Sequence, residues 1–196
     1  NRGQVTIYAG AVGGLSTEPL YVLDKHVGHS TSDFMGYGVA DAGDFDGDGF
    51  PDVAVLSRGE DRPGNFNNAA YAPDIPCVGS NSNTGTVAIY RSDGATLMDD
   101  QPAFIWYGSQ KGQNMERMAA GLDINGDGKD DFVAGGDDWD RPGQGGAGGF
   151  SVVFGLWHWN DPKVDVICEP EFTYTGLLGG DRLASDITGI GDVNGD

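Results

Sequence analysis

The chain carries, at residues 44–52, the sequence Asp44-Phe45-Asp46-Gly47-Asp48-Gly49-Phe50-Pro51-Asp52. This first loop has Asp at positions 1, 3, 5 and 9 and Gly at position 6, and the other copies have Asn at position 3. The pattern recurs in a second loop, 123–131, and its first five positions recur in a third loop, 192–196. Alternating side-chain oxygens around a glycine turn suit Ca²⁺, which takes about six to eight oxygen ligands. The repetition predicts both a metal and an architecture of repeated units.

We predict that each loop binds calcium through side-chain oxygens and one backbone carbonyl. The loops are not EF-hands, because their twelfth positions, where an EF-hand needs a bidentate Glu, hold Val55 and Ala134. The predicted ligands are Asp44, Asp46, Asp48, Asp52 and the carbonyl of Phe50 in the first loop, Asp123, Asn125, Asp127, Asp131 and the carbonyl of Lys129 in the second, and Asp192, Asn194 and Asp196 in the third, which is incomplete.

Short apolar runs between the loops predict β-strands rather than helices. The loops begin at residues 44, 123 and 192, so they are 79 and 69 residues apart, a spacing that fits one multi-stranded sheet per repeat. We expect strands at 38–43 and 118–122 before the loops, at 52–56 and 131–135 after them, at 3–8, 85–90 and 149–154, and at 20–23, 103–107 and 171–174.

The first repeat resembles a known family. Gly36-Tyr37-Gly38-Val39-Ala40, the first loop and the strand at 52–55 look like an FG-GAP repeat. The second copy lacks the leading Phe-Gly, and the third copy matches from Leu183 to Asp196, where the sequence ends. The resemblance implies an all-β fold, a β-propeller of integrin-α type with four-stranded antiparallel blades. Each blade would run strand A, calcium loop, strand B, long loop, strand C, turn, strand D.

The positions of the repeats then divide the chain into blades, which together make an incomplete propeller. Residues 1–33 would be strands C and D of one blade, 34–112 and 113–180 two complete blades, and 181–196 the start of a further blade. Propellers close with about four to eight blades. We therefore expect the remaining blades to come from chain outside this segment or from a partner.

The long B–C loops, 58–84 and 136–148, share one end of the predicted blades with the D–A loops, away from the calcium loops. Both contain an Asp-Arg-Pro-Gly turn, with Asp61 and Asp140 in step. Such a repeat is either a structural turn or a ring of charge that binds a ligand. The resemblance implies partner binding at this end. The candidate ligand-binding residues are Asp61, Arg62, Trp139, Asp140 and Arg141.

The composition limits which partners the chain can bind and where it is located. Eleven basic and 30 acidic residues give a net charge of −19, which repels nucleic acid and anionic membranes, and no run of apolar residues is long enough to span a membrane. Weak calcium loops fill at the millimolar calcium found outside cells, so we expect a secreted or cell-surface protein. Cys77 and Cys168 could pair with each other, pair elsewhere, or stay free.

Three functions fit these features. The first is a non-catalytic module for adhesion or protein binding, with calcium as a structural clamp. The second is a lectin that uses the Trp and Asp residues of the long loops, such as Trp139, while Trp157 and Trp159, two residues apart, would share one strand face. The third is the propeller part of an enzyme acting on polysaccharides, with candidates Arg62, Tyr71, Arg141 and Arg182. No GxSxG, HExxH or P-loop motif is present. We therefore expect adhesion or protein binding, with another protein or a surface glycan as partner.

Overall fold

The protein is represented by a computed structural model, which describes residues 3–24, 33–62, 82–92, 94, 101–109, 111–140, 143–156, 165–167 and 170–191. Every regular element in these ranges is a β-strand, which confirms the all-β class. None of the sheets they form closes on itself. The same ranges contain no helix with the length and apolar character needed to cross a membrane.

Two large sheets repeat one strand order. In the first, β5 (Met35–Gly43), β6 (Asp52–Ser57), β7 (Thr86–Tyr90) and β8 (Phe104–Tyr107) are successive antiparallel neighbours. In the second, β9 (Arg117–Leu122), β10 (Asp131–Gly136), β11 (Gly149–Val153) and β13 (Phe172–Thr175) follow the same order. These strands lie where the apolar runs predicted them.

Two small sheets and one extra strand complete the fold. At the N-terminal side β1 (Val5–Ile7) pairs with β4 (Tyr21–Leu23), as the sequence predicts for strands at the end of a repeat. The hairpin of β2 (Gly10–Ala11) and β3 (Gly14–Leu15) was not predicted. Neither was β12 (Asp165–Ile167), which pairs in parallel with β8 and so joins a segment that follows β11 to the outer edge of the first sheet.

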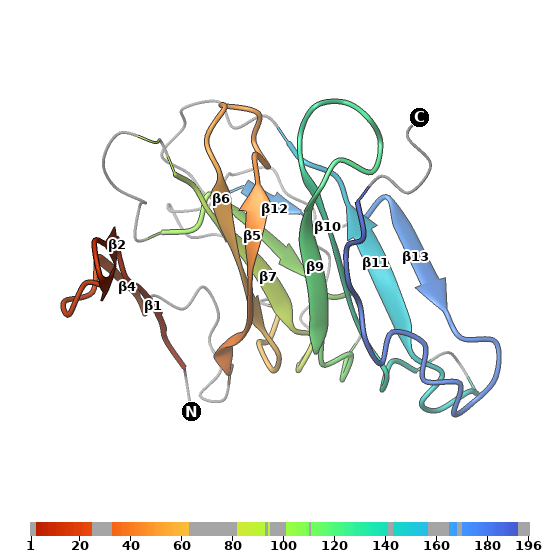
Figure 1. Ribbon diagram of the computed structural model, residues 1–196. Coiled ribbons are helices and arrows are strands. Elements are labelled where there is room, and N and C mark those ends of the chain that lie inside the picture. The colour runs from red at the N-terminus through yellow and green to blue at the C-terminus, as the bar shows by residue number, and fades with distance from the viewer. Residues whose placement is uncertain are drawn as a thin grey trace.

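The sheets stand side by side, with β1 and β4, then the first sheet, then the second sheet across Figure 1. The strand β5 packs beside β9, so the strands that precede the two complete loops are neighbours. A smaller core joins β1 and β4 to the first sheet through Val5, Leu23, Val55 and Tyr90. A larger core lies between the two large sheets.

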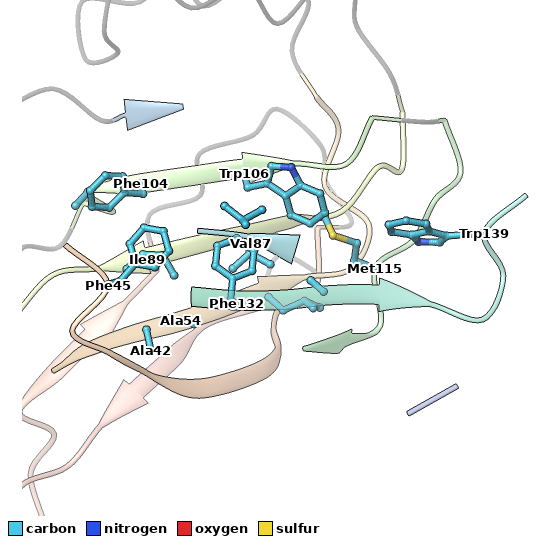
Figure 2. Packing of buried hydrophobic residues seen from close by; sticks show 14 residues of the cluster. Ala42, Phe45, Ala54, Val87, Ile89, Phe104, Trp106, Met115, Phe132 and Trp139 are labelled. Atoms are coloured by element: carbon cyan, nitrogen blue, oxygen red, sulfur yellow. The ribbon is translucent and has the colours of Figure 1, made fainter. Parts of the chain in front are cut away.

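The larger core explains why β6, β7 and β8 are buried along nearly their whole length. The first sheet has a neighbour on each face, so its strands read as continuous apolar runs rather than as half-buried alternations. Aromatic rings fill the space between the sheets in Figure 2, where Phe45 lies 5.1 Å from Phe104 and 5.8 Å from Phe132 between ring centroids. Each such ring contributes roughly 1.5–3 kcal/mol by leaving water.

A glycine marks the same point in three successive repeats. Gly3, Gly85 and Gly148 have φ of 81°, 79° and 73°, values that L side chains rarely adopt. A Cβ on any of them would collide with the backbone of the residue that opens the next repeat. Those partners are Met35, Met115 and Leu183 respectively. The recurring close approach fixes the register between neighbouring units.

The strand order places the connections at two opposite ends. The connection after β7 meets the first loop, where the Ser92 amide donates to Asp52 Oδ1 at 3.0 Å. At the other end, the Asn114 amide donates to the Asn83 carbonyl at 3.1 Å, which ties the connection after β8 to the one after β6. The predicted metal loops are therefore separated from the long loops by the length of a strand.

Candidate metal centre

The first loop joins β5 to β6 and is held by its own carboxylates. Asp44 Oδ2 accepts the Gly49 amide at 2.9 Å, Asp46 Oδ1 the Asp48 amide at 3.1 Å, and Asp48 Oδ1 the Phe50 amide at 2.9 Å. Gly49 has a φ of 93°, which an L side chain would strain. Each of the three aspartates thus folds the loop with one oxygen and keeps its second oxygen for another partner.

Three of the predicted ligands come together. Asp44, Asp46 and Asp48 each offer a carboxylate oxygen, and these atoms lie within 4.8 Å of one another. Oxygens that share a calcium ion at about 2.3–2.6 Å each lie at most about 5 Å apart, so the spacing fits one coordination sphere.

Three buried oxygens in this loop lack a hydrogen-bond partner: Asp44 Oδ1, Asp46 Oδ2 and Asp52 Oδ2. Of these, Asp46 Oδ2 forms an ion pair with Arg91. A buried carboxylate oxygen without a partner carries a large desolvation penalty, which a bound cation removes. Hard, negatively charged oxygens are the donors that Ca²⁺ prefers. The residues present therefore fit calcium, with Asp44, Asp46, Asp48 and Asp52 as the side chains that would hold it.

Electrostatics in the first loop also favour a cation. Burial, followed by the neighbouring carboxylates of Asp46 and Asp48, raises the pKa of Asp52 to about 7 despite the opposing Ser92 amide. The pKa of Asp46 is raised as well, first by burial and then by Asp48. Crowded carboxylates repel one another when ionised, and a divalent cation relieves that repulsion.

Arg91, the residue after β7, reaches into the first loop. Its Nε lies 2.7 Å from Asp46 Oδ2, and its Nη2 lies 2.8 Å from Asp48 Oδ2. No local sequence pattern predicts this contact, because Arg91 and Asp48 are 43 residues apart. A loop with four aspartates could, however, have prompted a search for a basic residue at the ends of neighbouring strands.

The second loop repeats the hydrogen bonds of the first. Asp123 Oδ2 accepts the Gly128 amide at 3.0 Å, Asn125 Oδ1 the Asp127 amide at 2.9 Å, and Asp127 Oδ1 the Lys129 amide at 2.9 Å. In the last position, Asp131 Oδ1 accepts the amide of Gly155 at 2.8 Å. The same sequence pattern therefore builds the same loop twice.

The two loops differ in how their charge is balanced. In the second loop Lys129 Nζ lies 2.7 Å from Asp127 Oδ2, and this contact lowers the pKa of the exposed Asp127. Burial raises the pKa of Asp131. Among the described residues, only the first loop brings three carboxylate ligand atoms together. The predicted set of the second loop thus shares its loop fold but not its carboxylate cluster.

Asp130 links the two loops. Its Oδ2 accepts the Asp44 amide at 2.8 Å, and its own amide donates to the Asp44 carbonyl at 3.0 Å. A Cβ at Gly43 would collide with the Asp130 side chain, so this contact requires glycine. The sequence shows only an extra Asp in the second loop, with no sign that it faces the first.

At the opposite end, the aspartates that open the two Asp-Arg-Pro-Gly motifs hold loops together. Asp61 Oδ1 accepts the Asn83 amide at 2.7 Å, and Asp140 Oδ1 accepts the Gly146 amide at 2.8 Å. Trp139 is 1% exposed and packs in the larger core, and Arg62 is also buried. These contacts give the motif a structural role, and ligand binding by it stays a prediction.

Several residues singled out in the sequence lie outside the described ranges. They are Asp192, Asn194 and Asp196 of the third loop, Arg141, Tyr71, Trp157, Trp159, Cys77 and Cys168.

The chain matches no model of a known protein family, and it matches no curated protein.

Proposed function

We propose that this chain is part of an extracellular calcium-binding β-propeller that mediates adhesion or protein–protein binding, with calcium as a structural clamp. The observation that carries the proposal is the first loop. Three carboxylates converge there, and the buried oxygens Asp44 Oδ1 and Asp52 Oδ2 have no hydrogen-bond partner. Calcium at this position would hold the turn between β5 and β6 through the turn's own carboxylates.

The propeller part of the proposal is supported by the stacking of equivalent sheets. The strands β5 and β9 lie side by side, and residues 187–191 lie against β9 across a groove of about 440 Å³. This groove is lined by small residues such as Ala120, Gly121 and Gly189. Small side chains let successive strands crowd toward a common axis. Residues 183–191 are irregular apart from the bridge between Leu183 and Gly148, and we infer that they occupy the place of the inner strand of a third unit.

The binding surface in this proposal is the end opposite the metal loops. There the connection after β13 exposes Leu177 and Leu178, next to the exposed Arg182. Apolar side chains beside an arginine are common at protein interfaces. A calcium-clamped scaffold that presents loops at its far end is suited to adhesion. The proposed extracellular location follows from the millimolar calcium concentration that such loops require.

The lectin alternative depends on exposed aromatic rings at this end, and the buried Trp139 does not support it. The enzyme alternative gains no specific support at the long-loop end, where the described residues bring Asp137 Oδ2 within 4.0 Å of Arg182 Nη1 as a simple ion pair. Binding to a glycan array in calcium would favour the lectin.

A calorimetric titration tests the calcium part of the proposal. We expect the whole chain to bind Ca²⁺ with a dissociation constant between about 10⁻⁵ and 10⁻³ M, and to bind Mg²⁺ far more weakly. The Asp44→Asn variant should lose the first-loop site. If the wild-type chain is folded by circular dichroism but shows no heat of calcium binding, the proposal is contradicted.

The adhesion part needs its own test. Beads coated with the chain should bind a cell surface in calcium, and a Leu177→Ser/Leu178→Ser variant should bind it less while keeping its calcium affinity. Equal binding of this variant and the wild type would place the contact surface elsewhere.

A further inference from the structure

Each metal loop is paired with one basic side chain, and the two side chains come from different positions in the repeat. In the first loop the cation is Arg91, which follows β7, and the seventh loop position is Phe50. In the second loop the seventh position is Lys129, which supplies the cation. The residue that follows β11, equivalent to Arg91, is Phe154.

This equivalence rests on matched hydrogen bonds. Asp52 accepts the amide of Ser92, the residue after Arg91, and Asp131 accepts the amide of Gly155, the residue after Phe154. Arginine and phenylalanine therefore occupy corresponding places in the two sheets.

Both cations meet the same oxygen. Arg91 Nη2 lies 2.8 Å from Asp48 Oδ2, and Lys129 Nζ lies 2.7 Å from Asp127 Oδ2. These are the aspartates at position 5 of each loop. Their other oxygen, Oδ1, is used in both loops to accept an amide within the loop. Two unrelated basic side chains that converge on one oxygen identify it as the position where a loop of this kind needs positive charge.

We propose that Arg91 and Lys129 are built-in counter-cations that neutralise the loops without metal and that calcium must displace to bind. The inference rests on the proposed function, since it concerns how the same loops take up calcium. It assigns Arg91 and Lys129 as the residues that set calcium affinity, each acting on its own loop.

The two exchanges have different consequences. Release of Lys129 frees a side chain within its own loop. Release of Arg91 breaks a contact between the first loop and the end of β7, because Arg91 bridges Asp46 and Asp48 from a separate strand. Calcium in the first loop therefore replaces a bridge between two elements, while calcium in the second loop replaces a local pair.

The test is a calcium titration of the whole chain by calorimetry at fixed ionic strength. Arg91→Gln should tighten binding at the first loop by at least about tenfold, because it removes a unit charge in direct contact with the ligands. Arg91→Lys, which keeps the charge, should change it less. Lys129→Gln should tighten calcium binding at the second loop alone. The same titrations in an Asp44→Asn background, which lacks the first-loop site, assign each binding event to its loop.

Arg117→Gln is the matched control. It changes the net charge by the same amount, but Arg117 Nε donates to the Ser185 carbonyl at 3.0 Å, away from the loop carboxylates. An unchanged calcium affinity in this variant, beside a large gain in Arg91→Gln, supports displacement. Equal gains in the two variants would show a general field effect and overturn the inference.

A second measurement follows Arg91 directly in the wild-type chain. The Nε–H resonance of Arg91, assigned by its loss in Arg91→Lys, should shift in step with calcium saturation while that of Arg117 does not. A chain that binds calcium without moving the Arg91 signal overturns the inference and leaves the proposed function standing. A chain that binds no calcium at all overturns the proposed function as well.

Discussion

At the scale of residues, the aspartates of the first loop divide their two oxygens between separate tasks. One oxygen of Asp44, Asp46 and Asp48 accepts a loop amide, so the turn is shaped by the same side chains that would bind metal. This sharing explains why the sequence spacing alone predicts that these three carboxylates come together. It also means that the loop is largely formed before the ion arrives.

Asp48→Ala should lower thermal stability in calcium and change it little in chelator. Without calcium the variant loses the partly exposed pair with Arg91 and the exposed hydrogen bond from the Phe50 amide, each of which contributes about 1 kcal/mol or less. With calcium it also loses a ligand, and with it roughly 1.4–2.7 kcal/mol of binding-linked stability at 10–100 times the dissociation constant. Melting curves in both conditions measure this. The exposed Asp138→Ala is the control, and an equal loss in both conditions for Asp48→Ala would refute its metal role.

Glu60 gives the chain a pH dependence separate from metal. It is 1% exposed, and burial, followed by the nearby Asp33 carboxylate, raises its pKa from 4.5 to about 8. Below pH 4.5 the carboxyl is protonated in both states and has no effect. Between pH 4.5 and 8 the unfolded chain releases its proton while the folded chain keeps it, so stability falls as pH rises.

Glu60→Gln should remove this dependence. Between pH 5 and 8, ionisation of Glu60 should cost the wild-type chain on the order of 3 kcal/mol of unfolding free energy. The Glu60→Gln variant, which cannot ionise at this position, should not show that loss. Urea unfolding in chelator at pH 5, 6.5 and 8 measures the difference. Parallel decreases in the two proteins would show that Glu60 is not protonated in the fold.

At the scale of elements, the sequence predicts most of the strands, because each apolar run lies between turn residues and is too short for a helix. It does not predict β12, since a three-residue strand that pairs in parallel with β8 depends on the path of the chain through space. The contacts of Arg91 and Asp130 were missed for the same reason. Both depend on which strand ends meet, and no local pattern contains that information.

The recurring glycine offers a test at this scale. Gly85→Ala would strain a backbone at φ 79° and place Cβ 2.8 Å from the Met115 amide nitrogen. Gly112→Ala has a similar φ of 74° with open space around it. Strain alone destabilises by about 1 kcal/mol, so Gly112→Ala should lose about that much and Gly85→Ala at least about 1–2 kcal/mol more. Urea unfolding compares them, and equal losses would show that the close approach of the two repeats is not required.

At the scale of the whole molecule, the order in which the sheets stack decides which surfaces are buried. Phe104 pairs with Ile89 in the first sheet, and Phe172 pairs with Val152 at the corresponding place in the second. Phe104 is 1% exposed because the second sheet covers it, whereas Phe172 is 51% exposed. In a propeller the next blade would cover Phe172. The sequence shows two equivalent aromatic residues and cannot tell which one has a neighbour.

This matched pair tests the stacking. Phe104→Ala should lower the unfolding free energy of the chain by about 3–5 kcal/mol, as expected for a large side chain removed from a core, and Phe172→Ala by less than about 1 kcal/mol. Chemical denaturation of the two variants at one pH measures both values. Similar losses would mean that the second sheet is already covered and that the stacking order is different.

The most direct test of the central claim, that the loops bind calcium and clamp the fold, is a melting curve of the whole chain with calcium, with magnesium and with chelator. The account predicts a rise specific to calcium of roughly 3–10 °C, the shift that about 1.4–2.7 kcal/mol produces in a chain of this size. The same melting temperature in all three conditions would contradict it, because carboxylates that converge on an ion would then gain nothing from its presence.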